Sequence, residues 1–310
     1  IRGDVISEST LFTIYAQKGL VNDALDAFKQ MQHKSMLPDR YAFASMISAC
    51  SSQGAFHEGE KMHDYIAGTM LETDLVAGTA LINMYGKCRK VWLARSLFDK
   101  MHIHDVISWT AMIAGYVHDV DHVCEGLILF EKMLLDGVIL PNSFTFLNVT
   151  NACTKLGDLQ AGRMIHEHVI EYGLDVNPYS VNALINMYVK CGALNKAEEV
   201  FQGLLDKDLG SFHPLLARYA QEGQAEDALK CFESMRSQCI YWDAFTLSCI
   251  LRACTSIGDI KKGKQIHTEV VSNKLLLKDN ELGMVLIEMY VKWGMVSEAE
   301  KILRWLPLCD

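Results

Sequence analysis

One nine-residue stretch recurs along this chain at intervals of about one hundred residues. The string "ALINMYGKC" (80–88) returns as "ALINMYVKC" (183–191) and, more loosely, as "VLIEMYVKW" (285–293). Recurrence at a fixed interval is typical of repeat architectures, in which one supersecondary unit is copied along the chain. We therefore expect the 310 residues to fold as an array of copies rather than as unrelated globular domains.

Each long interval contains three shorter units, and every unit closes on Asp or Asn. The unit lengths are 35, 35 and 31 residues, then 37, 35 and 31, then 35, 36 and 31. The units span residues 5–39, 40–74, 75–105, 106–142, 143–177, 178–208, 209–243, 244–279 and 280–310. The sequence thus predicts three unit types, written three times in a single array over residues 1–310.

Every unit shows two helical patterns separated by a turn at or near a glycine. The second pattern holds a small residue four positions before a larger one, as in Ala24 and Phe28, Ala94 and Phe98, Ala197 and Phe201, Ala228 and Phe232, Gly59 and His63, Gly162 and His166, and Gly263 and His267. Such pairs share a helix face, and the small member admits a neighbouring helix. One helical pair cannot bury these faces alone, so the copies are expected to stack into an α-solenoid.

Composition restricts the class of protein. Half of the residues are hydrophobic, but no apolar run reaches the roughly 18 residues of a membrane helix. No signal-peptide pattern is present either, so we expect a soluble chain that does not engage a membrane. The chain begins with Ile1 rather than Met, and we expect any targeting peptide or further domain to lie beyond its ends.

The ten cysteines recur with the repeat instead of pairing. Cys50, Cys153 and Cys254 end related strings, Cys88 and Cys191 occupy the same place in the opening motif, and no C-x-x-C spacing occurs. We interpret the cysteines as reduced, buried, small hydrophobic residues, and we expect no metal site.

Three strings together resemble the pentatricopeptide repeat family: "VISWTAMIAGY" (106–116), "GRMIHEHVI" (162–170) and "NALINMYVKCGALNKAEEVF" (182–201). The triplet lengths resemble the plant PLS subclass of that family, and the resemblance covers residues 5–310. It implies an all-α fold, a right-handed α-solenoid superhelix of nine two-helix repeats in three P-L-S triplets. Tetratricopeptide repeats are the nearest alternative, but they would neither alternate three lengths nor close each unit on Asp or Asn.

The resemblance implies that the chain binds single-stranded RNA, one base per repeat, with the first helices lining the groove. The fifth and last residues of a repeat would read the edge of a base. The implied reading pairs are Ser9 with Asp39, Thr79 with Asp105, Thr110 with Asn142, Asn182 with Asp208, and His213 with Asp243. The first four pairs imply G, G, A and U, hence a core of 5′-GnGAnU-3′, whereas His213 with Asp243 is an unusual combination.

The second residue of each repeat would sandwich a base. These implied stacking residues are Ile6, Val76, Ile107 and Tyr179, with Tyr41, Phe144 and Phe245 in the middle repeats. Gly210 and Glu281 take that place in repeats seven and nine, so we expect the C-terminal triplet to hold RNA less well. Lys87, Lys190 and Lys292 would meet RNA phosphates.

The same residues have simpler structural interpretations. Asp or Asn directly before a helix is a favoured N-cap. Lysines near a helix C-terminus are favoured by the helix dipole, and apolar second residues are commonly part of a core. The net charge of −9 also departs from the basic footprint of a general nucleic-acid binder. We therefore expect weak RNA binding without a sequence match, and affinity that falls as salt rises.

No catalytic constellation is evident. The string "HTE" (267–269) matches the first half of the zinc-deaminase signature, but P-C-x-x-C does not follow. His63 and His166 occupy the same place without that glutamate, so we interpret His267 as structural. We expect no enzyme activity, no metal, no cofactor and no small-molecule substrate for this chain.

The resemblance implies a site-recognition factor for C-to-U RNA editing in a mitochondrion or chloroplast. Its partners would be editing-complex proteins, or a deaminase that lies beyond Asp310 or acts in trans. Two alternatives stay open: a factor for RNA stabilisation, processing or splicing, and a protein-interaction scaffold that no longer reads RNA. Salt-sensitive, sequence-selective RNA binding separates the scaffold from the others.

Overall fold

The computed structural model describes residues 2–18, 20–33, 39–272 and 280–305. It divides into two compact parts, an N-terminal body (Ile1–Ser180) and a C-terminal body (Val181–Asp310). All regular secondary structure in the described residues is helical, as predicted. None of the helices described is long and apolar enough to cross a membrane.

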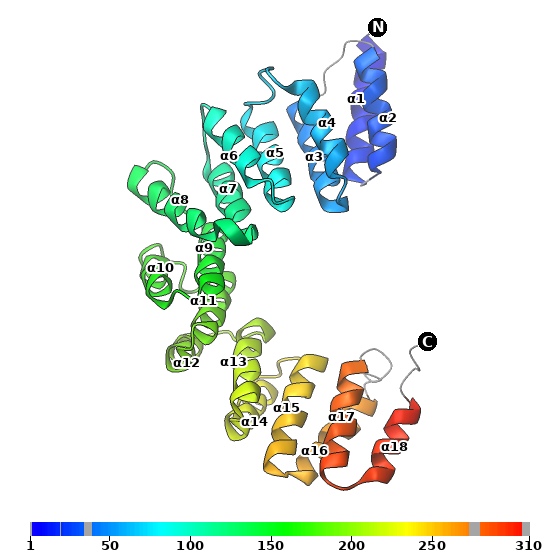
Figure 1. Ribbon diagram of the computed structural model, residues 1–310, viewed down its shortest axis with the longest axis vertical. Helices are drawn as coiled ribbons and strands as arrows, with labels where there is room; N and C mark the ends of the chain where they lie inside the picture. Colours follow the sequence, from blue (N-terminus) through cyan, green and yellow to red (C-terminus); the bar gives the residue numbers. More distant parts are fainter. Residues whose placement is uncertain (1, 19, 34–38, 273–279, 306–310) are drawn as a thin grey trace. The chain divides into compact units, whose positions relative to one another are not determined.

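The N-terminal body is a succession of helical pairs (Figure 1). Its helices are α1 (Arg2–Gln17), α2 (Val21–His33), α3 (Arg40–Gln53), α4 (Phe56–Ile66), α5 (Leu75–Lys87), α6 (Val91–Lys100), α7 (Val106–His118), η1 (Val120–His122), α8 (Val123–Asp136), α9 (Ser143–Leu156) and α10 (Leu159–Glu171). Helices α1, α3, α5, α7 and α9 pack side by side in chain order, and each also packs on its own second helix. The short helix η1 occupies the longer turn of the fourth repeat.

The C-terminal body continues the same pattern. Helix α11 (Pro178–Lys190) crosses the division between the bodies, and it is followed by α12 (Leu194–Gly203), α13 (Leu209–Glu222), α14 (Ala225–Ser237), α15 (Ala244–Ile257), α16 (Ile260–Ser272), α17 (Asn280–Lys292) and α18 (Val296–Trp305). Here α13 packs on α15, and α15 packs on α17. Asp279 and Asp310, which close the last two predicted repeats, lie outside the described residues, and the nine repeat boundaries stay a prediction.

Asp and Asn side chains begin the first helices. Asp39 caps α3 by accepting hydrogen bonds from the backbone N–H groups of Tyr41 and Ala42. Asp74, Asp105, Asn142, Asp208 and Asp243 cap α5, α7, α9, α13 and α15 in the same manner. The Asn177 side chain accepts from the N–H groups of Tyr179 and Ser180. The predicted capping role is confirmed at these positions, and each cap satisfies N–H groups that a helix start leaves without partners.

The small residues of the second helices lie in contact with a neighbouring first helix. A Cβ added to Gly59 would overlap the Met84 side chain, and one added to Gly263 would overlap the Trp293 ring. Ala228 and Phe232 are both fully buried. The packing role predicted for the small-and-large pairs is confirmed at these sites.

Helices α5 and α7 approach each other most closely at two glycines. A Cβ added to Gly86 would lie 2.8 Å from the Cα of Gly115, whereas a Cβ added to Gly115 would lie 3.3 Å from the Cα of Gly86. Real Cβ atoms essentially never come as close as the first value, and backbone cannot move aside as a flexible side chain does. The contact therefore requires glycine at residue 86 and tolerates alanine better at residue 115.

We expect Gly86→Ala to lower the free energy of unfolding by about 1–3 kcal/mol, because the added methyl group overpacks a backbone contact. Gly115→Ala should cost less. Gly203→Ala is the matched control, since its added Cβ meets nothing within 4 Å. Urea denaturation of the three variants measures these differences. Equal stability of Gly86→Ala and Gly203→Ala would contradict the close approach of α5 and α7.

Two histidine–tyrosine hydrogen bonds join second helices to the first helix that follows. His63 Nδ1 lies 2.7 Å from the Tyr85 hydroxyl, and His267 Nδ1 lies 2.8 Å from the Tyr290 hydroxyl. The two pairs occupy equivalent places in α4 with α5 and in α16 with α17. His267, the first residue of the "HTE" string, is thus part of the packing, as predicted.

Burial lowers the pKa of His267, although Glu298 opposes the shift. An unfolded histidine has a pKa of about 6.5. Because the pKa of folded His267 is lower, the unfolded side chain takes up its proton at a higher pH than the folded one does. Because the unfolded state then binds more protons, we expect the free energy of unfolding to fall as pH drops below that value. Chemical denaturation at pH 7.5 and pH 5.5 should show a smaller pH effect in His267→Gln than in the wild type. An identical pH effect in both proteins would contradict this account.

The cysteines were predicted to be buried, and this is only partly correct. Cys50, Cys153 and Cys254 are buried, as the recurring strings suggested, and Cys88 and Cys191 are partly buried. Cys124 and Cys239 are exposed, so the prediction is wrong for these two. Cys231 and Cys249 are also buried. Cys124 and Cys239 fall outside the recurring strings, so the periodic pattern carried no information about them.

Candidate nucleic-acid interface

Five large apolar side chains near the starts of first helices are exposed. Tyr41, Ile107, Phe144, Tyr179 and Phe245, each second in its predicted repeat, have exposed fractions of 62, 60, 58, 65 and 45%. The interpretation of these second residues as core therefore does not hold for the five. Exposed aromatic and aliphatic faces at regular intervals are available to stack on nucleic-acid bases.

Two of these rings face each other. The centroids of Phe144 and Tyr179 are 6.4 Å apart, and the ring planes differ by 27°. Stacked bases rise about 3.4 Å per step, so a base held between two rings needs about 6.8 Å. A slight separation of the rings would therefore admit one base.

A predicted reading pair and its two stacking residues share one depression. Thr110, Asn142, Ile107 and Phe144 line a depression of about 280 Å³ on the N-terminal body. Its other lining residues are Asn83, Ala111, Ala114 and Asn148. The floor thus combines apolar surface with a few polar groups, the composition expected of a site that holds a flat, polar-edged ligand.

Two polar residues of this depression, Thr110 and Asn142, are joined by Thr145, the third residue of α9. The Asn142 side-chain oxygen accepts from the Thr145 backbone N–H at 3.0 Å and from the Thr145 hydroxyl at 3.1 Å. The Thr110 hydroxyl lies 2.7 Å from the Thr145 hydroxyl. Because its oxygen is occupied, Asn142 offers its amide N–H groups to a ligand.

In the C-terminal body, the second reading pair is directly bonded. The Asn182 amide nitrogen donates to both carboxylate oxygens of Asp208, at 3.0 and 3.1 Å. A Cβ added to Gly210 would lie 2.7 Å from that nitrogen. The glycine was predicted only to lack a stacking surface, and the structure shows that it also leaves room for the Asn182–Asp208 pair.

The third pair, His213 with Asp243, is also in contact. His213 Nε2 lies 3.2 Å from Asp243 Oδ1. Burial raises the pKa of Asp243, but hydrogen bonds from the backbone N–H and hydroxyl of Thr246, with the charge of His213, outweigh it and hold that pKa below its usual value. Asp243 therefore stays an ionised acceptor beside His213.

The pair Thr79 and Asp105 departs from the expectation. Thr79 was predicted to face the groove, yet its side chain is only 8% exposed, and its hydroxyl has no hydrogen-bond partner among the described residues. The predicted stacking residue Val76 is partly buried. The side chains of Ile6 and Ser9 lie outside the described residues.

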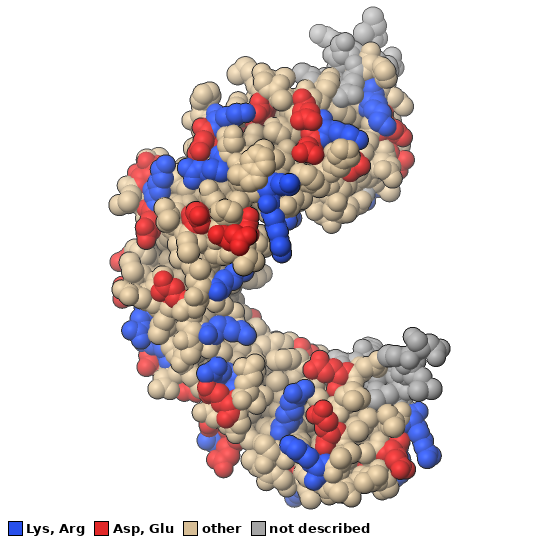
Figure 2. All heavy atoms as spheres, in the orientation of Figure 1, with Lys and Arg blue, Asp and Glu red and all other residues tan. Residues whose placement is uncertain are grey.

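Three lysines were predicted to meet RNA phosphates. Lys87, Lys190 and Lys292 are exposed at the last residues of α5, α11 and α17, and none forms an ion pair within the described part of the chain. The Arg40 guanidinium lies over the Tyr41 ring, 5.2 Å from its centroid. Figure 2 shows basic and acidic side chains interspersed on the face in view. The phosphate and solvated interpretations of the three lysines both stay open.

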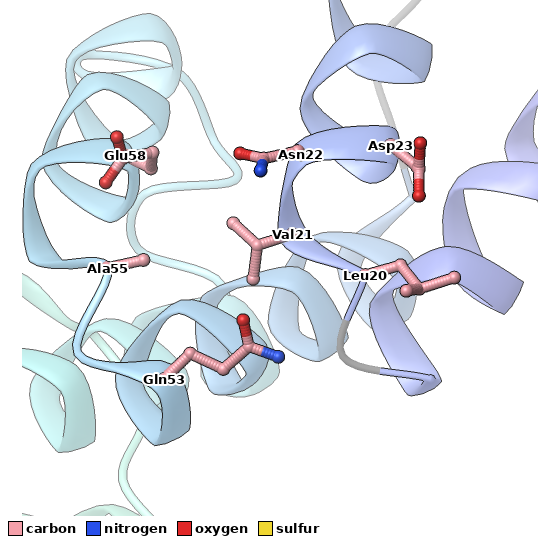
Figure 3. Close-up of a pocket in the computed structure, with 7 residues that line it drawn as sticks. All are labelled: Leu20, Val21, Asn22, Asp23, Gln53, Ala55 and Glu58. Carbon is pink, nitrogen blue, oxygen red and sulfur yellow. The ribbon is translucent and has the colours of Figure 1, made fainter.

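A second depression, of about 390 Å³, lies between the turns that end α1 and α3 (Figure 3). Asp23 and Glu58 line it together with Asn22 and Gln53. Two carboxylates would repel RNA phosphates. Elsewhere in the residues described, no group of three or more His, Cys, Asp and Glu side chains is placed to hold a metal ion.

Sequence reasoning missed Asn83, Thr145 and Asn148. A signal existed for Asn83, which lies four residues after Thr79 and hence on the same face of α5. Asn148 directly follows the fifth residue of its repeat. Nothing in the sequence alone indicated that the Thr145 hydroxyl turns toward the preceding repeat, because that contact joins residues 35 positions apart.

Helical pairs that stack through their first helices, and that expose apolar residues beside polar pairs, define a solenoid of helical repeats. The sequence model of the PPR repeat family matches residues 3–52, and that of the PPR repeat matches residues 79–106, 179–209, 211–240 and 284–304. Together these matches cover just over half of the chain. The chain belongs to the pentatricopeptide repeat family.

Individual relatives agree with this assignment. Over 96% of its length, the chain is 34% identical to a chloroplastic pentatricopeptide repeat-containing protein of Arabidopsis thaliana and covers 37% of it. It is 30% identical to a mitochondrial one from the same plant and covers 43% of that protein. The chain thus spans well under half the length of these relatives.

A solved structure shows the same fold. The crystal structure of the pentatricopeptide repeat protein PPR10 in complex with an 18-nt psaJ RNA element superposes with a TM-score of 0.73 and 18% identity. The match covers 97% of this chain and 45% of that protein. At this identity the likeness concerns the solenoid fold alone.

The caps allow stability and base reading to be separated. Asp208 accepts from the Ser211 backbone N–H at 2.8 Å. We expect Asp208→Ala to lower the free energy of unfolding by about 1 kcal/mol and Asp208→Asn to leave it nearly unchanged, because Asn caps as well as Asp. Urea denaturation checks this, with the nearby exposed Asp206→Ala as control. A loss in Asp208→Ala no larger than in Asp206→Ala would contradict a stabilising cap.

Proposed function

We propose that this chain binds single-stranded RNA in a sequence-specific manner, with one base to a repeat. The main supporting observation is the depression that the predicted stacking residues Ile107 and Phe144 line together with the predicted reading pair Thr110 and Asn142. Support also comes from PPR10, which has the same fold and whose structure contains RNA.

Binding would combine a sequence-independent and a sequence-dependent contribution. Stacking on exposed residues such as Phe144 and Tyr179 contributes roughly 1–3 kcal/mol per base and discriminates little. The Asn142 amide N–H offers a donor, which suits N1 of adenine and opposes the N1–H of guanine. Asp208 offers only acceptors beside the Asn182 amide, a combination assigned to uracil by the family resemblance. The proposed core is therefore 5′-GnGAnU-3′.

The two guanines of this core have less structural support than the A and the U. Thr79 would have to become accessible before it touched a base, because its side chain is buried. The described part of the chain gives no side-chain geometry for Ser9. We expect the positions read by Thr110 with Asn142, and by Asn182 with Asp208, to dominate selectivity.

The biological role follows from this binding. We infer that the chain acts in an organelle, since its relatives are named as chloroplastic or mitochondrial. We further propose that it selects sites for C-to-U editing, with a deaminase beyond Asp310 or in trans. This role rests on the resemblance of the triplet lengths to the PLS subclass. Occupancy of a transcript without editing, as in stabilisation, processing or splicing, is the alternative within RNA biology.

A protein-interaction scaffold is the second candidate function. Apolar side chains in and near the loops between repeats are almost fully exposed, as at Met70, Leu135 and Leu205. The net charge of −9 is also unusual for a nucleic-acid binder. Absence of selective RNA binding in the experiment below would favour this function.

The test is fluorescence anisotropy with a labelled RNA that contains GnGAnU and with a second RNA in which G replaces the A. We expect the wild type to prefer the first RNA and Asn142→Asp to prefer the second, because a carboxylate accepts from the N1–H of guanine. Each matched base contributes about 1–3 kcal/mol, so the preference should change by about tenfold or more. Affinities should fall as salt rises.

Asn195→Asp is the matched control, because it adds the same charge at an exposed position on the second helix α12. It should weaken both RNAs slightly and leave the preference unchanged. Equal binding of the two RNAs by the wild type would show that Thr110 and Asn142 do not read a base.

A further inference from the structure

The third residue of several first helices is a fully buried Ser or Thr. Ser108, Thr145, Ser211 and Thr246 each have an exposed fraction of 0%. Each donates its backbone N–H to the Asp or Asn that caps its own helix, at 2.8, 3.0, 2.8 and 3.0 Å. In this respect the four residues are alike, and all contribute to capping.

The hydroxyls of the serines and the threonines point to different acceptors. Ser108 and Ser211 donate to the backbone carbonyl oxygen of their cap residue, at 2.9 and 2.7 Å. Thr145 and Thr246 donate instead to the side-chain oxygen of theirs, at 3.1 and 2.9 Å. Of the four hydroxyls, only those of the threonines therefore bond the side chain that is proposed to read a base.

The same threonine hydroxyls reach the other member of the reading pair, which comes from the preceding first helix. Thr145 Oγ1 lies 2.7 Å from Thr110 Oγ1, and Thr246 Oγ1 lies 3.4 Å from His213 Nε2. The serine site differs. Ser108 bonds the cap Asp105, whose predicted reading partner is Thr79. The Thr79 hydroxyl has no partner among the described residues.

Proton counting fixes what Thr110 offers. Thr145 has one hydroxyl proton, and it is donated to Asn142. The oxygen of Thr145 also accepts from the Asn142 backbone N–H at 3.2 Å. We therefore assign Thr110 as the donor of the hydrogen bond between the two threonine hydroxyls. The Thr110 oxygen is left with lone pairs only, so toward the groove it acts as an acceptor.

We propose that Thr145 and Thr246 are positioning residues that determine which hydrogen-bonding groups the preceding reading pair presents to a base. This proposal rests on the proposed RNA binding. At the first site, Thr110 is held as an acceptor and Asn142 as a donor. That combination matches the N6–H donor and N1 acceptor of adenine, and it mismatches the O6 acceptor and N1–H donor of guanine in the same pose.

Thr246 acts in the same way on a different pair. Its proton goes to Asp243, so it cannot donate to His213 Nε2. The His213 Nε2 proton is then the one that bonds Asp243 at 3.2 Å. This assignment leaves Nδ1 as the ring nitrogen available to a base. The buried Thr246 hydroxyl thus contacts both members of the pair.

The test compares Thr145→Val and Thr145→Ser with the wild type, using the ratio of dissociation constants for RNAs with A or G at the base faced by Thr110. We expect Thr145→Val to reduce this ratio by about two- to tenfold, the value of one hydrogen bond. Thr145→Ser should also reduce the ratio, because Ser108 and Ser211 turn their hydroxyls to the backbone carbonyl of their cap residue. A purely structural role would instead weaken both RNAs alike and leave the ratio unchanged.

Ser211→Ala is the matched control, because its hydroxyl bonds only backbone groups, and it should not change the U preference at Asn182 and Asp208. Circular dichroism establishes whether each variant is folded. If Thr145→Val is not folded, Thr246→Val repeats the test at the base faced by His213. A wild type that discriminates, with Thr145→Val discriminating equally, would overturn the positioning role and leave RNA binding intact. A wild type that binds the RNAs with A and with G equally would overturn both the positioning role and the proposed base reading by Thr110 and Asn142.

Discussion

The side-chain caps that begin α3, α5, α7, α9, α11, α13 and α15 are the interaction on which the rest of the structure depends. When Asp39 or Asn142 accepts N–H groups of the next residues, it fixes the residue at which the helix begins. The direction of every later side chain then follows from helical geometry. In α9 the second residue, Phe144, is exposed and the third, Thr145, is buried beneath it. One cap therefore determines both a stacking surface and the support of a reading pair.

The same cap supports different chemistry in different repeats. At Asn142 a buried threonine occupies the side-chain oxygen and leaves an amide donor. At Asp208 the serine turns to the backbone, and both carboxylate oxygens bond the Asn182 amide directly. Gly210 makes that second arrangement sterically possible. Variation in three or four residues around a constant cap is sufficient to change the donors and acceptors that a repeat presents.

Much of this could be predicted from the sequence, because the determining contacts are local. The caps, the helix starts and the exposed second residues follow from Asp or Asn placed before a helical pattern. Contacts between helices were not predictable in the same way. Thr79 has the same residue type and register as Thr110, yet it is buried and its hydroxyl has no partner among the described residues. The roles of Gly210 and Thr145 likewise depend on residues about 30 positions away.

The close approach of Gly86 and Gly115 limits how far these repeats can be treated as interchangeable parts. The two glycines belong to consecutive first helices, and the contact between them is backbone on backbone. A repeat transplanted into this position from elsewhere in the chain would bring a side chain to residue 86, as the valine of "NMYVKC" (186–191) illustrates. An exchange of whole repeats would therefore have to keep Gly86 and Gly115 as a pair. An exchange of the reading residues alone would leave the contact between α5 and α7 unchanged.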